Sequence, residues 1–236
     1  MGSQAAPVRL RTGMAVTALV LSIISLCTGA GLLVGGLTAC VLGIVAAVKA
    51  SKNPQEYGGM PMAITAIVIS ALSFLALPII AAIAIPSLLR ARVSANESGA
   101  IGDLRTMISA QAAYQTANGG FYDSPECLAA PQGCIPGYPA TGPTFLDPTL
   151  ASAREKMGYV GTFHPGPAPA QLDPATHSRT SLTSYAYVLV PTTPGRTGVR
   201  AFCGDHSGTV CYTHTGSSPA VEEGACPPPP GCIPLQ

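Results

Sequence analysis

The sequence predicts an α+β membrane protein with N-terminal transmembrane helices, one long spine helix and a small antiparallel β-sheet head closed by disulfides. Three observations predict this class. Hydrophobic residues make up 47% of the chain and charged residues only 10%, and the deficit in charge lies mostly in the first 90 residues; soluble domains hold about 25% charged residues. A run with helical periodicity follows the last apolar stretch. Short alternating segments and six cysteines fill the remainder.

These features divide the chain into three expected regions. Residues 1–59 form a membrane domain, most simply a two-helix hairpin. Residues 60–117 form a third transmembrane span that continues as the spine helix. Residues 118–236 form an extracytoplasmic, disulfide-rich β head with a Pro-rich tail.

The first apolar run, Thr12 to Val48, contains no charged residue. As one straight helix it would extend about 55 Å, well beyond a hydrocarbon core of about 30 Å. We therefore expect a helical hairpin with arms at Gly13–Thr28 and Leu37–Lys49 and a Gly-rich turn at Gly29–Gly36. The many small residues of this run allow close helix packing.

A cleaved signal peptide is the alternative for this segment. Arg9 and Arg11 would be its basic region, Met14–Leu26 its apolar core and Thr28–Ala30 a small-residue cleavage site. The apolar pattern continues past that site, which favours the hairpin.

The second apolar run, Tyr57–Leu89, also lacks charge and is long enough for a span of about 20 residues. Arg90 and Arg92 follow it, where such side chains reach the membrane edge. Basic residues on the cytoplasmic side orient membrane proteins. The basic residues before this run therefore predict a cytoplasmic amino terminus and an outside location from Arg90 onward; they are Arg9, Arg11, Lys49 and Lys52.

The spine helix is predicted from apolar residues that recur at helical spacing after Arg92. Pro78 and Pro86 should kink it, because proline removes a backbone donor and clashes with the preceding turn. Asn118–Gly120 should end it, since Asn and Gly accept the left-handed conformation. The expected apolar stripe is Ile101, Leu104, Ile108 and Ala112, with Asp103 and Arg105 off it.

Two charged residues of the spine helix, Glu97 and Arg105, have two open interpretations. They are either solvated or paired between subunits of a helix bundle, and isolated surface pairs contribute little to stability. The apolar stripe on the same helix serves as core, interface or both.

The head is expected to contain one or two helical turns within Pro148–Met157 and several strands. If Cys203 faces Cys211, then Gly204 faces Val210, and a three-residue loop with glycine at its end closes the hairpin. The expected strands are Gly158–Phe163, Ser184–Val190, Val199–Cys203 and Thr209–Thr213.

Six cysteines lie after the spine helix, and their even number in a loop-rich region predicts disulfides and an oxidising compartment. Cys127 and Cys134 enclose a short loop and form a plausible local pair. A cross-strand bond between Cys203 and Cys211 is geometrically reasonable. The Pro-rich tail, which carries the last two, should run extended over the surface; they are Cys226 and Cys232.

No catalytic residue, cofactor or metal is predicted. Asp205, His206 and Ser207 are adjacent on a tight turn, so they point in different directions and form no relay. No histidine pair has the spacing of a helical zinc site and no Cys-x-x-Cys occurs. A calcium site from Asp205, Asp123 or Asp147 lacks a run of acidic ligands. A net charge of +1 gives no footprint for nucleic acid.

The segment IAAIAIPSLLRARVSANESGAIGDLRTMISAQAAYQTANGGFYD resembles the N-terminal helix of bacterial type IV pilins and type II secretion pseudopilins, with Pro86 as the helix proline. The resemblance covers Ala81 to about Thr213. It implies a spine helix, a connecting loop and a small antiparallel sheet packed on the helix. The peptidase site of that family is absent, since its first mature position would fall at Thr65 and its glutamate at Ile69.

The region before this segment resembles, in Arg11–Gly43 and in YGGMPMAITAIVISAL, a small Gly/Ala-rich bacterial membrane domain of unknown function. Together the two resemblances imply a fusion in the bacterial inner membrane, with the carboxy-terminal head periplasmic or extracellular. The implied role is structural. The implied partners are the lipid bilayer, copies of the chain or other pilin-like subunits, and membrane components of a pilus or secretion system.

Two other classes stay open. The head could be a binding module for an envelope or surface ligand, which exposed aromatics in Phe121–Phe145 and the pair Tyr185 and Tyr187 would support. A membrane-bound enzyme would need a pocket that gathers several polar side chains.

Overall fold

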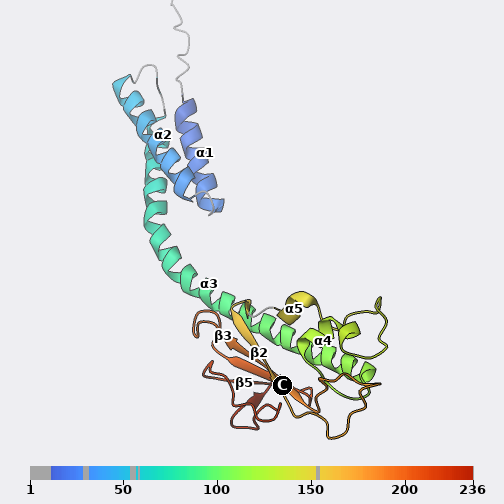
Figure 1. Cartoon of the computed structure of the whole chain (residues 1–236). Coiled ribbons are helices and arrows are strands. Elements are labelled where there is room, and N and C mark those ends of the chain that lie inside the picture. Colours follow the sequence, from blue (N-terminus) through green and yellow to red (C-terminus); the bar gives the residue numbers. More distant parts are fainter. Residues whose placement is uncertain (1–11, 29–31, 54–56, 58, 153–154, 236) are drawn as a thin grey trace, which may run out of the picture. The chain divides into compact units, whose positions relative to one another are not determined.

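The computed structural model describes residues 12–28, 32–53, 57, 59–152 and 155–235 of the chain. The chain divides into two compact units, Met1–Ser87 and Leu88–Gln236, and the division falls inside one long helix (Figure 1). Arg9, Arg11 and the centre of the expected turn and cleavage site, residues 29–31, lie outside the described residues.

The first unit contains helices α1 (Gly13–Thr28) and α2 (Leu32–Lys52) and the beginning of α3 (Met60–Ala117). The first arm of the expected hairpin is confirmed. The expected turn at Gly29–Gly36 is wrong in its second half, because α2 already begins at Leu32. In an apolar run each backbone N–H needs an internal hydrogen-bond partner. This requirement outweighs the cost of placing glycine in a helix, about 1 kcal/mol per residue relative to alanine.

Small residues pack the helices of the first unit together. Ala15, Ala46 and Ala63 form a buried cluster between α1, α2 and α3. A Cβ added to Gly43 would lie 3.0 Å from a side-chain carbon of Ile67, so the backbones approach closely there. Large apolar side chains of the same helices point outward; Val20, Val41 and Val68 are each about half exposed. The expectation of close packing through small residues is confirmed.

Pro78 and Pro86 both lie inside helix α3, which continues past each of them. Among the described residues, Pro78–Ala117 is the one helical segment long and apolar enough to cross a membrane, and two shorter apolar helical segments precede it, Ala15–Ile24 and Met60–Leu72. The large apolar side chains around the first proline are open to solvent; Leu75 is 69% exposed and Ile83 is 70% exposed.

The second unit is built on an antiparallel meander. In its described part, six strands lie in the order β1-β2-β3-β4-β5-β6 (Figure 1). The expected strands are confirmed with shifts of one or two residues at their ends. The strands are β1 (Glu155–Lys156), β2 (Tyr159–Pro165), β3 (Tyr185–Pro191), β4 (Ala201–Asp205), β5 (Val210–Thr213) and β6 (Ile233–Pro234).

The register of the β4–β5 hairpin is the expected one. Cys203 pairs with Cys211 and Gly204 with Val210. Gly208 closes the turn with a φ of +80°, a value that favours glycine, and its N–H donates to the Asp205 carbonyl at 3.0 Å.

Helix α3 packs on one face of the sheet with a stripe at positions 97, 100, 104, 107, 111 and 114. Leu104 and Tyr114 are fully buried in a core that includes Phe202 of β4. Of the expected stripe, Leu104 is confirmed, Ile101 and Ile108 lie half-buried at its flank, and Ala112 is exposed. The stripe turns away from Ala112 because Gln111 occupies the neighbouring core position, where its side-chain amide has backbone partners.

Glycine sets the distance between α3 and the centre of β4. A Cβ on Gly204 would lie 2.9 Å from Leu104 Cγ and 3.0 Å from Ile108 Cδ1. A larger residue at this position would require the side chains of Leu104 and Ile108, or the helix that carries them, to shift.

The opposite face of the sheet is covered by the C-terminal strap, which we define as residues 219–232. The strap is linked to β4 and β5 by Cys203–Cys226 and Cys211–Cys232. The expected bond between Cys203 and Cys211 is therefore wrong, although the two residues face each other. Both side chains point toward the strap, which brings its own cysteines to them. The expectation that the Pro-rich tail runs over the surface is wrong for its last residues. Cys232 is 1% exposed, and β6 pairs with β5 as a strand of the sheet.

The described part of the segment between α3 and the sheet contains three short helices. The expected local disulfide, Cys127–Cys134, is present and ties α4 to η1. The expected helical turn after Asp147 is α5. The helices are α4 (Pro125–Ala129), η1 (Pro131–Gly133) and α5 (Pro148–Ser152).

Peptide mapping under non-reducing conditions tests the cysteine pairing. We expect peptides that join Cys203 to Cys226 and Cys211 to Cys232. Replacing one pair by serine should lower the free energy of unfolding by about 3 kcal/mol, because each bond closes a loop of about 20 residues. A peptide joining Cys203 to Cys211 as the main product would contradict the arrangement of the strap.

Candidate functional site

The buried carboxylate of Glu97 joins α3 to the segment that connects β3 and β4. Its Oε1 accepts hydrogen bonds from the backbone N–H groups of Val199 at 2.8 Å and Arg200 at 3.1 Å. Its Oε2 accepts from Arg200 Nε at 2.9 Å and Nη2 at 2.7 Å. Glu97 is 6% exposed. The expectation that Glu97 is solvated or pairs with another subunit is wrong, because the β3–β4 connection of the same chain supplies every one of these partners.

The electrostatics of Glu97 follow from these contacts. Burial raises the pKa of its carboxyl, but the hydrogen bonds from Val199 and Arg200 and the positive charge of Arg200 outweigh burial, and the pKa lies below its ordinary value of 4.5. Charge-assisted hydrogen bonds of this bidentate kind are the strong ones in proteins.

The guanidinium of Arg200 has aromatic as well as ionic contacts. It lies 5.1 Å from the ring centroid of Tyr212 and 5.4 Å from that of Phe202. Cation–π contacts at such distances favour a fixed position of the side chain. Arg200 was not predicted from the sequence. The only signal was a charged residue, Glu97, on an otherwise apolar stripe.

A second polar joint lies at the other end of the stripe. Gln111 Nε2 donates to the Asp123 carbonyl at 2.6 Å, and Tyr114 donates its hydroxyl hydrogen to Asp123 Oδ2 at 3.0 Å. Asn118 Nδ2 donates to Ser181 Oγ at 2.9 Å. Burial and the neighbouring carboxylate raise the pKa of Tyr114, so its hydroxyl stays a donor. This network fixes the point where the chain leaves α3.

The arginines among the helix-packing candidates take no part in the hydrogen bonds of these joints. Arg90, Arg92 and Arg105 are exposed on α3. Asp103, off the stripe as expected, pairs instead with Lys156 of β1, with 2.6 Å between Oδ1 and Nζ. The structure therefore brings together Glu97 and Arg200, but not Glu97 and Arg105.

The turn Asp205–Ser207 is a polar hairpin tip, as expected. Asp205 Oδ1 accepts from the Ser207 N–H at 3.0 Å and from its hydroxyl at 2.6 Å. Asp205 Oδ2 accepts from the Cys226 N–H at 2.9 Å, which holds the strap against β4. Asp205 is 7% exposed. Its carboxylate thus binds two backbone N–H groups and the Ser207 hydroxyl.

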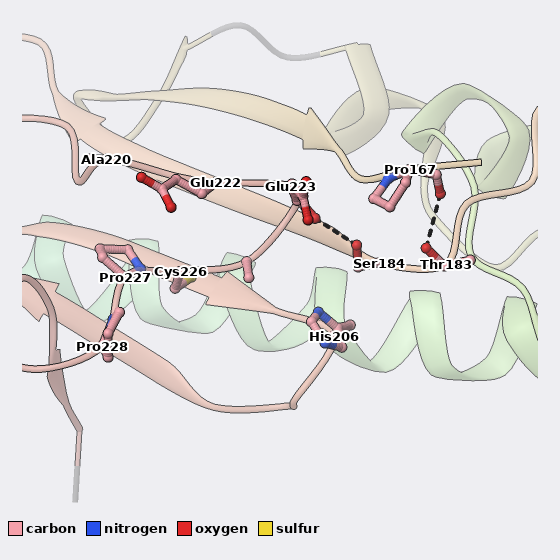
Figure 2. A pocket seen from close by; sticks show the side chains of 11 residues that line it. Pro167, Thr183, Ser184, His206, Ala220, Glu222, Glu223, Cys226, Pro227 and Pro228 are labelled. Carbon is pink, nitrogen blue, oxygen red and sulfur yellow. Dashed lines mark hydrogen bonds between the residues drawn. The ribbon is translucent and has the colours of Figure 1, made fainter. Parts of the chain in front are cut away.

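A groove lies where the strap passes the ends of β3 and β4 (Figure 2). Its volume is about 1000 Å³. Ser184 Oγ donates to the Glu223 carbonyl at 2.7 Å across it, and Glu223 adopts a φ of +48°. Among the described residues, no hydrogen bond links the side chains of His206, Glu222 and Glu223. The other lining residues are Pro167, Thr183, Ala220, Ala225, Cys226, Pro227 and Pro228.

The sulfur atoms of Cys203, Cys211 and Cys226 lie within 4.8 Å of one another. Each belongs to a disulfide, and a disulfide sulfur is not a thiolate ligand for a metal. The three acidic residues considered as calcium ligands make separate contacts within the protein. Asp123 and Asp205 bind within the protein, and Asp147 accepts a hydrogen bond from the Thr149 N–H at 2.7 Å.

The aromatic residues that would mark a binding surface pack inward. Tyr185 and Tyr187 are 1% and 6% exposed. Phe145 is half-buried against the ring of Tyr114, at a centroid distance of 5.4 Å, and against that of Tyr138, at 5.8 Å.

Comparison with known proteins identifies no relative: no protein-family model, curated protein or solved structure matches the chain.

Replacing Glu97 by glutamine tests the joint at the base of the sheet. We expect a loss of about 2 kcal/mol in the free energy of unfolding, since hydrogen bonds to charged groups contribute about that much. Tyrosine fluorescence during urea unfolding is a suitable measure, because every tyrosine except Tyr57 lies from Tyr114 onward and tryptophan is absent.

Asp103→Asn is the matched control, because Lys156, its partner, is 45% exposed. Exposed pairs contribute less than about 1 kcal/mol. Equal losses in Glu97→Gln and Asp103→Asn would contradict a special role of the Glu97 joint.

The pH dependence of unfolding tests the charge on Glu97. A carboxylate whose pKa is lower in the folded than in the unfolded state stabilises the fold fully above its ordinary value, 4.5, and loses this effect as the pH falls through the folded value. The urea midpoint of the wild type should therefore drop below about pH 4.5. The drop should be smaller in Glu97→Gln, and parallel curves for the wild type and Glu97→Gln would refute the assignment.

Proposed function

We propose that this protein is a membrane-anchored, pilin-like assembly subunit of a bacterial type IV pilus or type II secretion-type filament system. One observation carries the proposal. Helix α3 continues from a stretch of exposed apolar side chains into a segment that packs a disulfide-bonded antiparallel sheet on one face only. The pilin resemblance of Ala81 to about Thr213 implies this combination of helix, connecting loop and sheet.

Anchoring in a bilayer is supported by the apolar surface of α3 before Arg90. Soluble monomeric proteins rarely expose contiguous apolar patches of more than a few hundred Å². Leu72, Leu75, Ile79 and Ile83 are each more than 60% exposed. The disulfides of the second unit favour an oxidising compartment, which agrees with a cytoplasmic amino terminus and an outer head.

Assembly is supported by the face of α3 that the sheet leaves open. Small side chains recur along this face at helical spacing, which lets a second helix approach closely. The pattern is interrupted only around Arg105 and Thr106. The exposed small residues are Ala91, Ala95, Ser98, Gly102, Ser109 and Ala113.

A binding module on a membrane anchor is the second candidate function. The groove beside the strap favours it, since its volume, about 1000 Å³, is in the range of ligand sites. Glu222, Glu223 and His206 line the groove and suit a polar ligand. In that case α3 would serve only as an anchor and its open face would have no partner.

A bulky residue on the open face of α3 separates the two functions. Gly102 is exposed, and no atom lies within 4 Å of an added Cβ. We expect Gly102→Trp to reduce the crosslinked oligomers of the full chain in membranes several-fold without lowering its unfolding midpoint, because the indole blocks helix approach.

The matched control is Gly133→Trp, since Gly133 is also exposed and also has no atom within 4 Å of an added Cβ. It should leave crosslinking unchanged. A wild-type chain that stays monomeric in membranes, or equal effects of both substitutions, would contradict the assembly role and favour the binding module.

A further inference from the structure

A basic pocket lies at the base of the second unit, between the first turns of α3 in that unit and the β3–β4 connection. Its volume is about 540 Å³. Three guanidinium groups line it against a single carboxylate, that of Glu97, which is already paired with Arg200. The pocket therefore has an excess of positive charge. Its lining includes Leu89, Arg90, Glu97, Arg196, Val199 and Arg200.

The loop that carries Arg196 is held in place by two consecutive residues of α3. Asn96 Nδ2 donates to the Thr197 carbonyl at 2.9 Å, and Glu97 accepts from Val199 and Arg200. Within the loop, the Arg196 N–H donates to the Thr193 carbonyl at 3.0 Å. This wall of the pocket is thus preorganised rather than adaptable.

The three arginines differ in how many hydrogen bonds and ion pairs their side chains already make. Arg200 is fixed by Glu97 through Nε and Nη2, and in the described residues no hydrogen bond uses its Nη1. The side chains of Arg90 and Arg196 are exposed, and no ion pair holds either of them in the described part of the chain. Guanidinium groups bind phosphate oxygens in bidentate fashion, so a phosphate group fits the charge and the donors of this pocket.

The apolar rim identifies the source of that phosphate. Leu89 is 53% exposed and Val199 is 50% exposed, and both line the pocket. Arg90 directly follows the uncharged run Tyr57–Leu89. A free anion would gain nothing from these side chains, whereas a phospholipid has acyl chains beside its phosphate, and basic pockets next to a membrane span bind lipid head groups.

We propose that this pocket binds the phosphate head group of an anionic phospholipid, so that the base of the second unit is fixed to the bilayer surface. The inference rests on the membrane anchoring proposed above. It adds a lipid partner and assigns Arg196, which lies far from the span in sequence, to lipid binding.

Native mass spectrometry of the full chain released from nanodiscs tests the proposal. The nanodiscs contain phosphatidylglycerol and phosphatidylcholine in equal amounts. We expect phosphatidylglycerol to be retained preferentially by the wild type and Arg196→Gln to lower its retention about fivefold, the effect of one basic residue near an anionic surface. Arg90→Gln should lower the retention of phosphatidylglycerol in the same way. It tests the proposal if Arg196→Gln fails to fold.

Arg92→Gln is the control, because Arg92 is exposed two residues further along α3 and does not line the pocket. It should leave lipid retention unchanged. Equal losses of phosphatidylglycerol retention in Arg92→Gln and Arg196→Gln would contradict binding in the pocket and would indicate a nonspecific attraction of the lipid to basic residues. Equal retention of both lipids, or displacement of phosphatidylglycerol by inorganic phosphate, would overturn the lipid as ligand. A monomeric chain that still retains phosphatidylglycerol would contradict assembly but not this proposal.

Discussion

The contact between Glu97 and the β3–β4 connection is the interaction on which the second unit depends. One carboxylate accepts two backbone hydrogen bonds and the guanidinium of Arg200, and so fixes the sheet against the helix at its base. Because the partners are consecutive residues, a shift of the connection by one residue would leave a buried charge unpaired, which is strongly destabilising. The basic pocket exists because the same contact holds its wall.

The two faces of the sheet are stabilised by different means. On the face toward α3, aliphatic and aromatic side chains form a close-packed core around Leu104 and Phe202. On the other face no helix packs in the described part of the unit, and the strap covers small residues such as Ala186 and is joined to the strands by disulfides. Small domains with little core commonly use disulfides in this way. The strap also forms one wall of the groove.

The division of α3 into faces connects the fold with the proposed function. A stripe with polar joints at both ends, Glu97 and Gln111, binds the chain's own sheet. The opposite face carries small residues that are exposed. A helix that uses one face for its own domain and leaves the other open suits a subunit that packs beside copies of itself, and a lipid at the base would set its height in the membrane.

The sequence by itself determined helices α1 and α3, strands β2 to β5 and their order. The apolar runs, the stripe around Leu104, the strands and the register that places Cys203 opposite Cys211 all follow from periodicity and spacing of neighbouring residues, which local geometry controls. Only the tertiary structure decided the partners of side chains distant in sequence. Cys203 binds Cys226 rather than Cys211, Glu97 binds Arg200 rather than solvent, and Arg196 joins Arg90 in one pocket. These pairs lie more than twenty residues apart, and the path of the loops between them, not any local preference, brings them together.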